Sequence, residues 1–225
     1  MAVHDHRFVP ALGFDILTPL YDIAVALTMR ERAFKSDLIA LANVAAGHRV
    51  LDLGSGTGTL AILLKATVPG AVVVGLDLDP RILGIAKAKA ERAGVAIEWT
   101  EGSVAEPPFA ARSFDRILSS LVFHHLMDAE KERALAAARR LLRPGGSLHI
   151  ADFAKPHSAY TRLAAAAFRH FDGAERTAAN LNGRMPDFLR AAGFAAVSES
   201  APRSTLFGTL TFVSGTADFT GPQPP

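Results

Sequence analysis

The sequence predicts an α/β fold in which helices cover both faces of a mostly parallel β-sheet. Three observations support this prediction. Short runs rich in valine, isoleucine and leucine alternate with segments of helical periodicity, and glycine or proline residues separate the two. The chain has 225 residues, 49% of them hydrophobic, which is enough for one well-filled core. We therefore expect a single α/β domain with additional helices.

Two strand–helix units open the predicted core. Residues 49–53 form a β-rich run that ends at a glycine, and residues 59–65 have the spacing of a helix. Residues 71–77 repeat the strand pattern, and Asp79-Pro80 then supplies an N-cap and a first-turn proline for a second helix. Consecutive units of this kind place their strands in parallel.

Three further strands continue the alternation. They are expected at residues 95–100, 114–119 and 147–153, with a helix at about 128–142 before the last of them. Arginines at the end of this helix suit the negative pole of its dipole, and Pro-Gly-Gly at residues 144–146 ends it. The parallel part of the sheet would thus have five strands.

The carboxyl-terminal part contains a predicted antiparallel hairpin. Runs with β character at residues 194–200 and 205–213 are separated only by a short turn that contains proline. The whole sheet would have seven strands, mostly parallel, with the last one antiparallel. Helical patterns at about 155–192 form an insertion before the hairpin.

Three regions follow from these patterns. Apolar residues between positions 12 and 41 recur at helical spacing, which predicts an N-terminal helical cap over residues 1–46. Residues 47–215 would form the core with its helical insertion. Residues 216–225 are expected to form a flexible tail.

Composition and charge narrow the functional classes. The net charge is +2 and no basic block occurs, so nucleic acid is not the favoured partner. The absence of cysteine excludes disulfides, thiolate metal ligands and cysteine nucleophiles. Residues 1–10 lack the apolar stretch of a signal peptide, and no later segment is apolar over a bilayer's thickness. We therefore expect no integral membrane segment and a cytoplasmic protein.

The central motif is a glycine turn between the first strand and its helix, Val50-Leu51-Asp52-Leu53-Gly54-Ser55-Gly56-Thr57-Gly58. Glycines let the backbone approach a ligand closely, and the helix start offers free N–H groups. A dinucleotide could use the same feature. However, the G-x-G-x-G spacing and the carboxylate of Asp52, which would repel a diphosphate and attract an ammonium group, favour a ligand that carries an amino acid.

A second motif closes the second strand and consists of Gly75-Leu76-Asp77-Leu78-Asp79. Asp77 follows the glycine turn at about the distance at which a carboxylate accepts hydrogen bonds from a ribose diol. Leu78 could pack on the face of an adenine ring. The second motif therefore adds a nucleoside to the expected ligand.

With these two motifs, the sequence resembles the class I S-adenosylmethionine-dependent methyltransferases over roughly residues 45–153. Phe114-Asp115 at the fourth strand and Arg143-Pro144-Gly145-Gly146 before the fifth are part of the resemblance. Within this superfamily the chain is most similar to the group of the ubiquinone and menaquinone C-methyltransferases, because of Tyr21-Asp22 near the N-terminus and Phe123-His124-His125-Leu126 after the fourth strand. The resemblance implies a three-layer Rossmann-like sandwich.

The resemblance also implies S-adenosylmethionine as the cofactor, S-adenosylhomocysteine as the product, and no metal. The cofactor-binding residues expected from it are Asp52, Gly54, Ser55, Gly56, Thr57, Gly58, Asp77, Leu78, Gly102, Ser103, Val104, Ser119 and Tyr21. The glycine turn would hold the methionine moiety, Asp77 the ribose hydroxyls, and residues 102–104 the adenine. Many relatives have an aspartate where Ser103 stands, although a serine can still accept one hydrogen bond. Ser119 and the adjacent Ser120 would lie beside the sulfonium and the acceptor.

Methyl transfer from a sulfonium is an in-line displacement, which mainly requires alignment and exclusion of water. If the acceptor must lose a proton, His124 or His125 is the best-placed general base, since histidine titrates near neutral pH. Tyr21, Asp22 and His157 are weaker candidates. The two adjacent histidines do not form a metal site by spacing, because neighbouring side chains point apart.

The expected acceptor is a small apolar molecule, such as a quinone precursor, a phenolic metabolite or a lipid-like compound. Residues 162–171 could form an amphipathic surface for peripheral lipid contact, and ordinary helix packing is the alternative. Asn180 and Asn182 either face the acceptor or bind the local backbone. Two other functions remain open, namely a non-catalytic S-adenosyl ligand sensor or partner subunit, and an NAD-dependent oxidoreductase.

Overall fold

The computed structural model describes residues 31–172 and 174–218, and the side chains within this part except those of residues 167–174. The strands are β1 (Arg49–Leu53), β2 (Val72–Asp77), β3 (Glu98–Glu101), β4 (Phe114–Ser120), β5 (Leu142–Ala154), β6 (Ala195–Glu199), β7 (Arg203–Thr205) and β8 (Gly208–Thr216). The helices are α2 (Glu31–Ala42), α3 (Thr59–Thr67), α4 (Pro80–Arg92), η2 (Phe123–His125, a 3-10 helix), α5 (Asp128–Leu141), α6 (Ala159–Asp172), α7 (Ala174–Leu181) and α8 (Met185–Ala191). The part of the predicted cap before residue 31, with Tyr21 and Asp22, lies outside the described residues.

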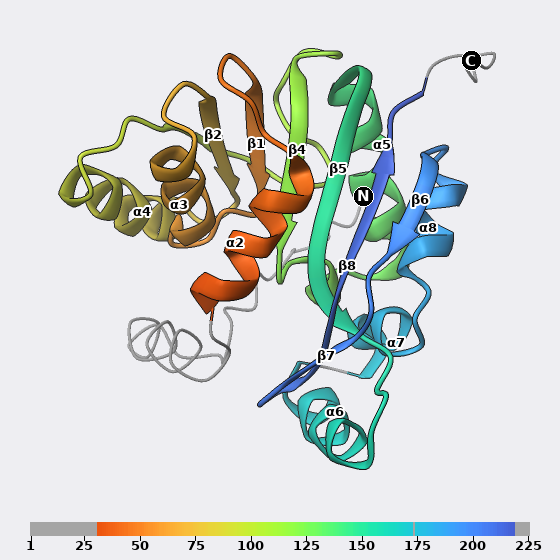
Figure 1. Cartoon of the computed structure of the whole chain (residues 1–225). Coiled ribbons are helices and arrows are strands. Elements are labelled where there is room, and N and C mark those ends of the chain that lie inside the picture. Colours follow the sequence, from red (N-terminus) through yellow and green to blue (C-terminus); the bar gives the residue numbers. More distant parts are fainter. Residues whose placement is uncertain (1–30, 173, 219–225) are drawn as a thin grey trace, which may run out of the picture.

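The strands form one sheet in the order β3-β2-β1-β4-β5-β8-β6, with β7 paired to β8 (Figure 1). The pairs β3–β2, β2–β1, β1–β4 and β4–β5 are parallel. β8 is antiparallel to both β5 and β6. The predicted fold class is confirmed, since the sheet is mostly parallel and its antiparallel strand comes last in the described chain.

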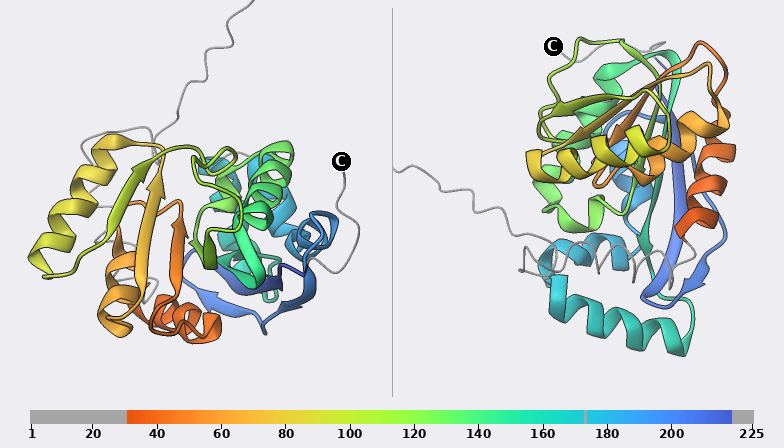
Figure 2. Two further views of the ribbon diagram at one scale, coloured as in Figure 1. Left: turned by 90° about the horizontal axis from the view of Figure 1, so that it is seen from above. Right: turned by 90° about the vertical axis from the view of Figure 1, so that its left-hand side faces the viewer.

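Helices cover both faces of the sheet (Figure 2). On one face, Phe34 and Leu38 of α2 and Leu60 of α3 share a buried cluster with Val50 of β1. On the other face, helices α5 and α8 share a second buried cluster with Leu51. Neighbouring residues of β1 thus enter opposite cores, which explains why a strand that is buried on both sides reads as a continuous apolar run.

Several strand boundaries differ from the predicted ones, two of them by more than three residues or for a clear local reason. β3 begins at Glu98, three residues later than predicted, because Gly94 and Val95 still belong to the C-terminal cap of α4. Gly94 has φ +67°, and the N–H of Val95 donates to the carbonyl of Ala90 (3.1 Å). β5 already begins at Leu142, which pairs with Phe114 of β4. Pro-Gly-Gly at residues 144–146 was predicted to end the preceding helix. It lies inside β5, where the pairing with β4 is irregular.

The predicted hairpin of the last two runs is confirmed, because β6 and β8 pair in antiparallel register. Short β7 intervenes between them and pairs with the first residues of β8. β8 continues to Thr216, and the N–H of Ala217 donates to the carbonyl of Gly146 (2.8 Å). The glycines near the start of β5 therefore hold the end of the last described strand.

Helices α6 and α7 form most of the predicted insertion. They pack against each other, and α6 contacts β8 while α7 contacts β5 and η2. Figure 1 places α6 below the end of β5, at the carboxyl ends of the parallel strands. Within the described ranges, no helix is both long and apolar enough to pass through a membrane.

Candidate cofactor and acceptor site

The candidate site lies at the edge of the sheet where the parallel strands end. Asp52 is near the end of β1, Asp77 closes β2, Ser120 closes β4, and Asp152 is near the end of β5. Ligands of open α/β sheets bind outside the carboxyl ends of the strands, next to the point where the strand order reverses. In this sheet that point is β1, between β2 and β4.

The glycine turn approaches its neighbours too closely for larger residues. Gly54 and Gly58 have φ angles of +76° and +79°, which favour glycine. A Cβ atom on Gly54 would lie 2.5 Å from a methyl of Val122, and one on Gly58 would lie 2.6 Å from the ring of Trp99. The N–H of Gly54 also donates to the carbonyl of Leu76 (2.9 Å). The turn is therefore fixed between β2 and the segment after β4.

Asp77 joins three parts of the site. Its Oδ2 accepts a hydrogen bond from the N–H of Gly56 (2.8 Å), and its Oδ1 accepts one from the N–H of Asp79 (3.1 Å). Its carbonyl accepts from the N–H of Gly102 (2.9 Å), which brings residues 102–104 beside it. Burial raises the pKa of Asp77, while the backbone donors oppose that rise. Each carboxylate oxygen keeps a second lone pair for a ligand hydroxyl.

Asp52 is a buried carboxylate with an unused oxygen. Its side chain faces the α2 and α3 side of the sheet, where Oδ2 accepts from the N–H of Ala61 (3.1 Å). Oδ1 has no hydrogen-bond partner among the described residues, and neither does the buried hydroxyl of Ser55. Burial raises the pKa of Asp52 to about 7, and the ammonium of Lys35 opposes this. Two polar atoms under the glycine turn thus lack partners that a ligand could supply.

The residues expected at the adenine lie around Asp77. Leu78 is 52% exposed, so its side chain is free to cover an aromatic ring. The Ser103 hydroxyl accepts a hydrogen bond from the N–H of Ala105 (3.2 Å). Val104 is partly buried against the core. The Ser103 hydroxyl thus caps its own loop.

Two other predicted residues make bonds within the protein. The hydroxyl of Thr57 accepts from the ammonium of Lys89 (2.9 Å), which fixes the turn to α4. Ser119 is fully buried and its hydroxyl donates to the carbonyl of Leu53 (2.8 Å). Ser119 therefore ties β4 to β1 at the strand ends, just below the glycine turn.

His124 forms a buried pair with Asp152, a residue that was not expected in the site. Leu121 has a φ of +59°, which turns the chain from β4 into η2. The ring Nδ1 of His124 lies 2.6 Å from Oδ1 of Asp152, and the His124 N–H donates to Oδ2 of the same carboxylate (3.3 Å). Burial would raise the pKa of Asp152, but His124 outweighs it and holds this pKa below its usual value. An aspartate among the apolar residues that end β5 was the signal in the sequence.

His125 has a different environment from that of its neighbour. Its ring lies 3.9 Å from that of His124, centroid to centroid. The neighbouring His124 ring, together with burial, lowers the pKa of His125 to about 3. His125 is therefore neutral at physiological pH, and only His124 has a carboxylate beside it.

Two buried lysines were also missed by the sequence analysis. Lys35 of α2 is paired with Glu31, one turn earlier, and lies on the same side of the sheet as Asp52. Lys131 of α5 donates to the carbonyls of Leu126 and Arg176, the second at 2.8 Å. The first brings positive charge to the glycine turn, and the second fixes the segment after η2 to α7. A lysine is almost never fully buried unless it is paired, and both of these lysines have partners.

The remaining candidates serve the local structure. Both ring nitrogens of His157 are engaged, Nδ1 with the hydroxyl of Thr209 (2.9 Å) and Nε2 with that of Ser204 (3.1 Å). Buried Asn180 donates to the carbonyl of Phe153 (3.3 Å), next to Asp152, and its Oδ1 has no partner among the described residues. Asn182 is exposed. Of these, only Asn180 is buried next to the pair of His124 and Asp152.

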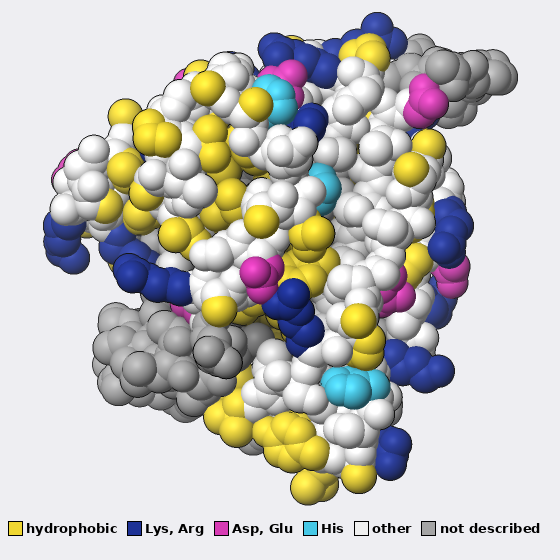
Figure 3. Space-filling view, viewed as in Figure 1, with side chains coloured by type: hydrophobic (Ala, Val, Ile, Leu, Met, Phe, Trp, Pro, Cys, Tyr) yellow, Lys and Arg dark blue, Asp and Glu magenta, His cyan; other side chains and the backbone are white. Residues whose placement is uncertain are grey.

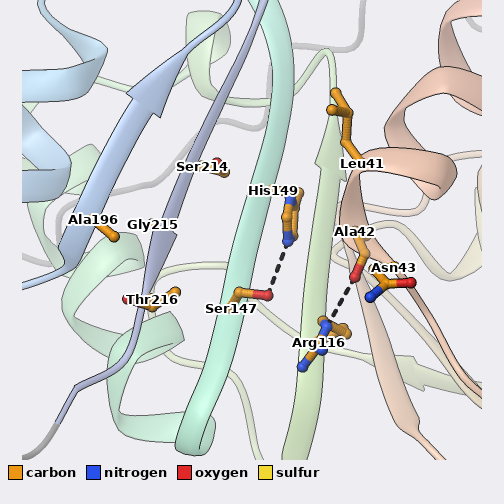
Figure 4. A pocket seen from close by; sticks show the side chains of 10 residues that line it. All are labelled: Leu41, Ala42, Asn43, Arg116, Ser147, His149, Ala196, Ser214, Gly215 and Thr216. Atoms are coloured by element: carbon orange, nitrogen blue, oxygen red, sulfur yellow. Dashed lines mark hydrogen bonds between the residues drawn. The ribbon is translucent and has the colours of Figure 1, made fainter.

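A cavity of about 160 Å³ lies elsewhere on the sheet, between α2 and β6 (Figure 4). Its polar residues include Arg116 and the pair Ser147 and His149, in which the hydroxyl and Nε2 are 2.9 Å apart. Burial and the charge of Arg116 lower the pKa of His149 to about 4. Arg116 and Ser147 stand in the first halves of β4 and β5, and His149 is near the middle of β5, so the cavity lies away from the strand ends that form the candidate site.

Comparison with known proteins shows which class of protein this chain resembles. Residues 50–146 match the family described as methyltransferase domain. The chain is 38% identical over 143 residues to the demethylmenaquinone methyltransferase of Thermus thermophilus, a match that covers 64% of this chain and 62% of the relative. Residues 50–146 thus resemble a methyltransferase domain, and the predicted resemblance to the class I S-adenosylmethionine-dependent methyltransferases is confirmed.

A second relative is a quinone C-methyltransferase. A ubiquinone/menaquinone biosynthesis C-methyltransferase of Pseudoalteromonas translucida is 31% identical over 150 residues, which are 65% of this chain and 57% of the relative. The chain therefore spans about three fifths of the length of the curated relatives that it matches. The fold is shared with phosphoethanolamine N-methyltransferase 2 of Haemonchus contortus in complex with S-adenosylhomocysteine, with a TM-score of 0.74 and 16% identity over 92% of this chain and 58% of that one.

Proposed function

We propose that this protein binds S-adenosylmethionine and transfers its methyl group to a small, apolar acceptor, such as a quinone precursor, a phenolic metabolite or a lipid-like molecule. The observation that carries the proposal is the pair of carboxylates on either side of the glycine turn. Asp52 has a buried oxygen without a partner, and Asp77 is fixed to the turn by Gly56. The names of the relatives agree with this proposal. A cytoplasmic location rests on the sequence alone.

The residues present fit this cofactor. The ammonium group of its methionine moiety would take the unused oxygen of Asp52, and Asp77 would accept hydrogen bonds from the ribose hydroxyls. Leu78 and Val104 would border the adenine, and Gly54 to Gly58 would let the chain approach closely. When bound, the cofactor supplies a methyl group on a positively charged sulfur, which leaves as a neutral thioether.

The same geometry disfavours NAD. A diphosphate at the glycine turn would need the backbone N–H groups of the turn, but Gly56 already donates to Asp77. The buried carboxylate of Asp52 beside it would also repel the diphosphate. Both observations support the amino-acid-bearing ligand over the dinucleotide.

The role of base falls to His124. In the tautomer that donates Nδ1–H to Asp152, the acceptor position of the His124 ring is Nε2. When the acceptor oxygen, nitrogen or carbon attacks the methyl group, its proton would pass to Nε2, and Asp152 would stabilise the resulting imidazolium. His125 has no carboxylate of this kind and stays neutral, so we assign it no proton transfer.

A non-catalytic sensor is the second candidate function. The observation in its favour is Ser103, which binds its own loop where many relatives carry an acidic residue. A sensor would bind the cofactor and never consume it. An enzyme would release S-adenosylhomocysteine when some acceptor is present.

Calorimetric titration with S-adenosylmethionine, S-adenosylhomocysteine and NAD in parallel tests the cofactor. We expect binding of the first two in the micromolar range and none of NAD. Incubation with methyl-labelled cofactor and quinone precursors, phenols and lipid extracts then tests the acceptor. Labelling of protein or RNA in place of all these compounds would contradict the proposal.

A further inference from the structure

An exposed apolar surface lies at the end of the molecule that carries the candidate site. On α6, Tyr160 and Leu163 stand three residues apart, hence on one face, and are 49% and 74% exposed. Leu206, in the turn between β7 and β8, is 53% exposed, and its carbonyl accepts a hydrogen bond from the Tyr160 hydroxyl (2.7 Å). We call these three residues the apolar tip. Hydrophobic side chains gather at this lower end in Figure 3.

The surroundings of the apolar tip are basic. Arg162 is exposed next to Leu163 on α6, Lys155 is exposed just after β5, and Arg203 of β7 is paired with Asp37 of α2. Residues 155–166 and 200–210, which include the tip and the segments next to it in the chain, contain no aspartate or glutamate. Acidic and basic residues are nearly balanced over the whole chain, with 22 and 24 of each. Positive charge is therefore in excess in these two segments, whereas it is nearly balanced over the whole chain.

We propose that the apolar tip docks on an anionic lipid bilayer. Apolar side chains flanked by lysine and arginine bind the interface of a membrane, where the apolar groups leave water and the cations face the lipid phosphates. A symmetric contact with a second copy would bring Lys155 and Arg162 of one protomer against those of the other, which costs energy. Charge complementarity thus favours an anionic bilayer over a second copy of the chain.

The position of the apolar tip suits the supply of an apolar acceptor. α6 follows β5 directly, and Lys155 is only three residues beyond Asp152, the partner of His124. A compound dissolved in the bilayer would thus start from the same end of the molecule as the acceptor side of the site. This interpretation rests on the proposed function, whereas the docking itself does not.

Sedimentation with lipid vesicles tests the docking without cofactor or acceptor. The full chain is mixed with vesicles of phosphatidylglycerol and phosphatidylethanolamine, or of phosphatidylcholine alone. We expect partitioning onto the first kind that weakens at high salt, and little onto the second. Leu163→Asp and Arg162→Glu should each weaken partitioning roughly tenfold or more. Ile85→Asp on α4 is the matched control, since Ile85 is also an exposed apolar helix residue (38%) and should have no effect.

Three outcomes would overturn the proposal. The first is no partitioning of the wild-type chain onto the anionic vesicles. The second is partitioning that Leu163→Asp and Arg162→Glu leave unchanged. The third is a concentration-dependent dimer, seen by light scattering, that Leu163→Asp disrupts, because then a second copy covers the tip. Binding of S-adenosylmethionine, measured separately, shows whether the proposed function stands when the docking fails.

Discussion

Nδ1 of His124 lies 2.6 Å from Oδ1 of Asp152, and each side chain is only 3% exposed. A hydrogen bond between an imidazole and a buried carboxylate fixes both the orientation of the ring and the nitrogen that carries the proton. The same carboxylate also accepts the N–H of Phe153 (2.7 Å). Asp152 is thus held from several sides and can in turn hold His124.

Asp152→Asn should lower kcat by about 10²-fold, because general base catalysis contributes at least this much and the amide cannot neutralise an imidazolium. The dissociation constant of S-adenosylhomocysteine should change little, since Asp152 is assigned no contact with the cofactor. Steady-state kinetics and calorimetry on the same preparation check both values. An equal loss of binding and turnover would indicate a merely structural role.

The two histidines should differ on substitution. His124→Gln is expected to reduce kcat by about 10²-fold or more, whereas His125→Gln should keep it within about tenfold of the wild type. The reason is that only His124 has a carboxylate partner, while the pKa of His125 is about 3. Circular dichroism and cofactor binding serve as controls for folding. A larger effect at His125 would exchange the roles of the two residues.

Cofactor affinity should depend on pH through Asp52. Burial raises the pKa of this carboxyl from its ordinary 3.8 to about 7, and only the ionised form attracts an ammonium group. Binding of S-adenosylmethionine should therefore weaken by roughly tenfold or more between pH 7.5 and pH 5.5. In Asp52→Asn this dependence should disappear and the affinity should stay low throughout. Calorimetry at the two pH values measures the effect.

The same residue should lower stability above neutral pH. A raised pKa means that the folded protein prefers the protonated carboxyl, so the free energy of unfolding falls as the pH rises from about 4 to about 7. Asn mimics the protonated form. Asp52→Asn should thus raise the free energy of unfolding by about 1 kcal/mol or more at pH 8, and by much less at pH 5. Urea titrations at both pH values would show the difference, and equal effects would contradict the assigned cause.

Asp77 and Asp79 provide a matched comparison. Asp77→Ala should weaken cofactor binding by about 1–3 kcal/mol, because ribose hydroxyls and the Gly56 N–H would lose an acceptor. Asp79 caps α4 by accepting from the N–H of Arg81 (2.8 Å). Asp79→Ala should therefore cost about 1 kcal/mol of stability and leave affinity nearly unchanged. Unchanged affinity in Asp77→Ala would exclude the ribose assignment.

Gly54→Ala tests the close approach of the glycine turn. The new Cβ would meet Val122 at 2.5 Å on a backbone with φ +76°, so we expect a loss of about 1–3 kcal/mol of stability. Val122→Ala added to this variant should restore part of the loss. A thermal-unfolding double-mutant cycle measures the coupling, and simple additivity would show that the contact is not the cause.

The sequence was sufficient to predict the parallel part of the sheet, the glycine turn and the two aspartates beside that turn. Asp52 and Asp77 could be predicted because each lies at or near the end of a strand. The carboxyl ends of parallel strands meet at the same edge of the sheet. The glycine turn could be predicted because its conformation requires glycine at fixed positions. These are local signals that do not depend on how distant segments meet.

The pairing of His124 with Asp152 could not be predicted in this way. It joins residues 28 positions apart, through the turn at Leu121 and the end of β5. The choice between His124 and His125 likewise depends on which of two adjacent rings turns toward the carboxylate. Lys35 lies on a helix whose packing against the sheet sets its distance from Asp52. Each of these three features depends on tertiary contacts, and neither hydrophobic periodicity nor a sequence motif contains that information.

The place of β8 has a consequence for biosynthesis. β8 lies between β5 and β6, yet among the described strands it is the last to leave the ribosome. Until then β5 has an open edge, and β6 lacks the only strand with which it pairs in the described part of the chain. Unpaired edges of this kind invite association between nascent chains. The sheet thus closes in a final step, and α8, which packs on β6 and β8, can reach its native place only after that step.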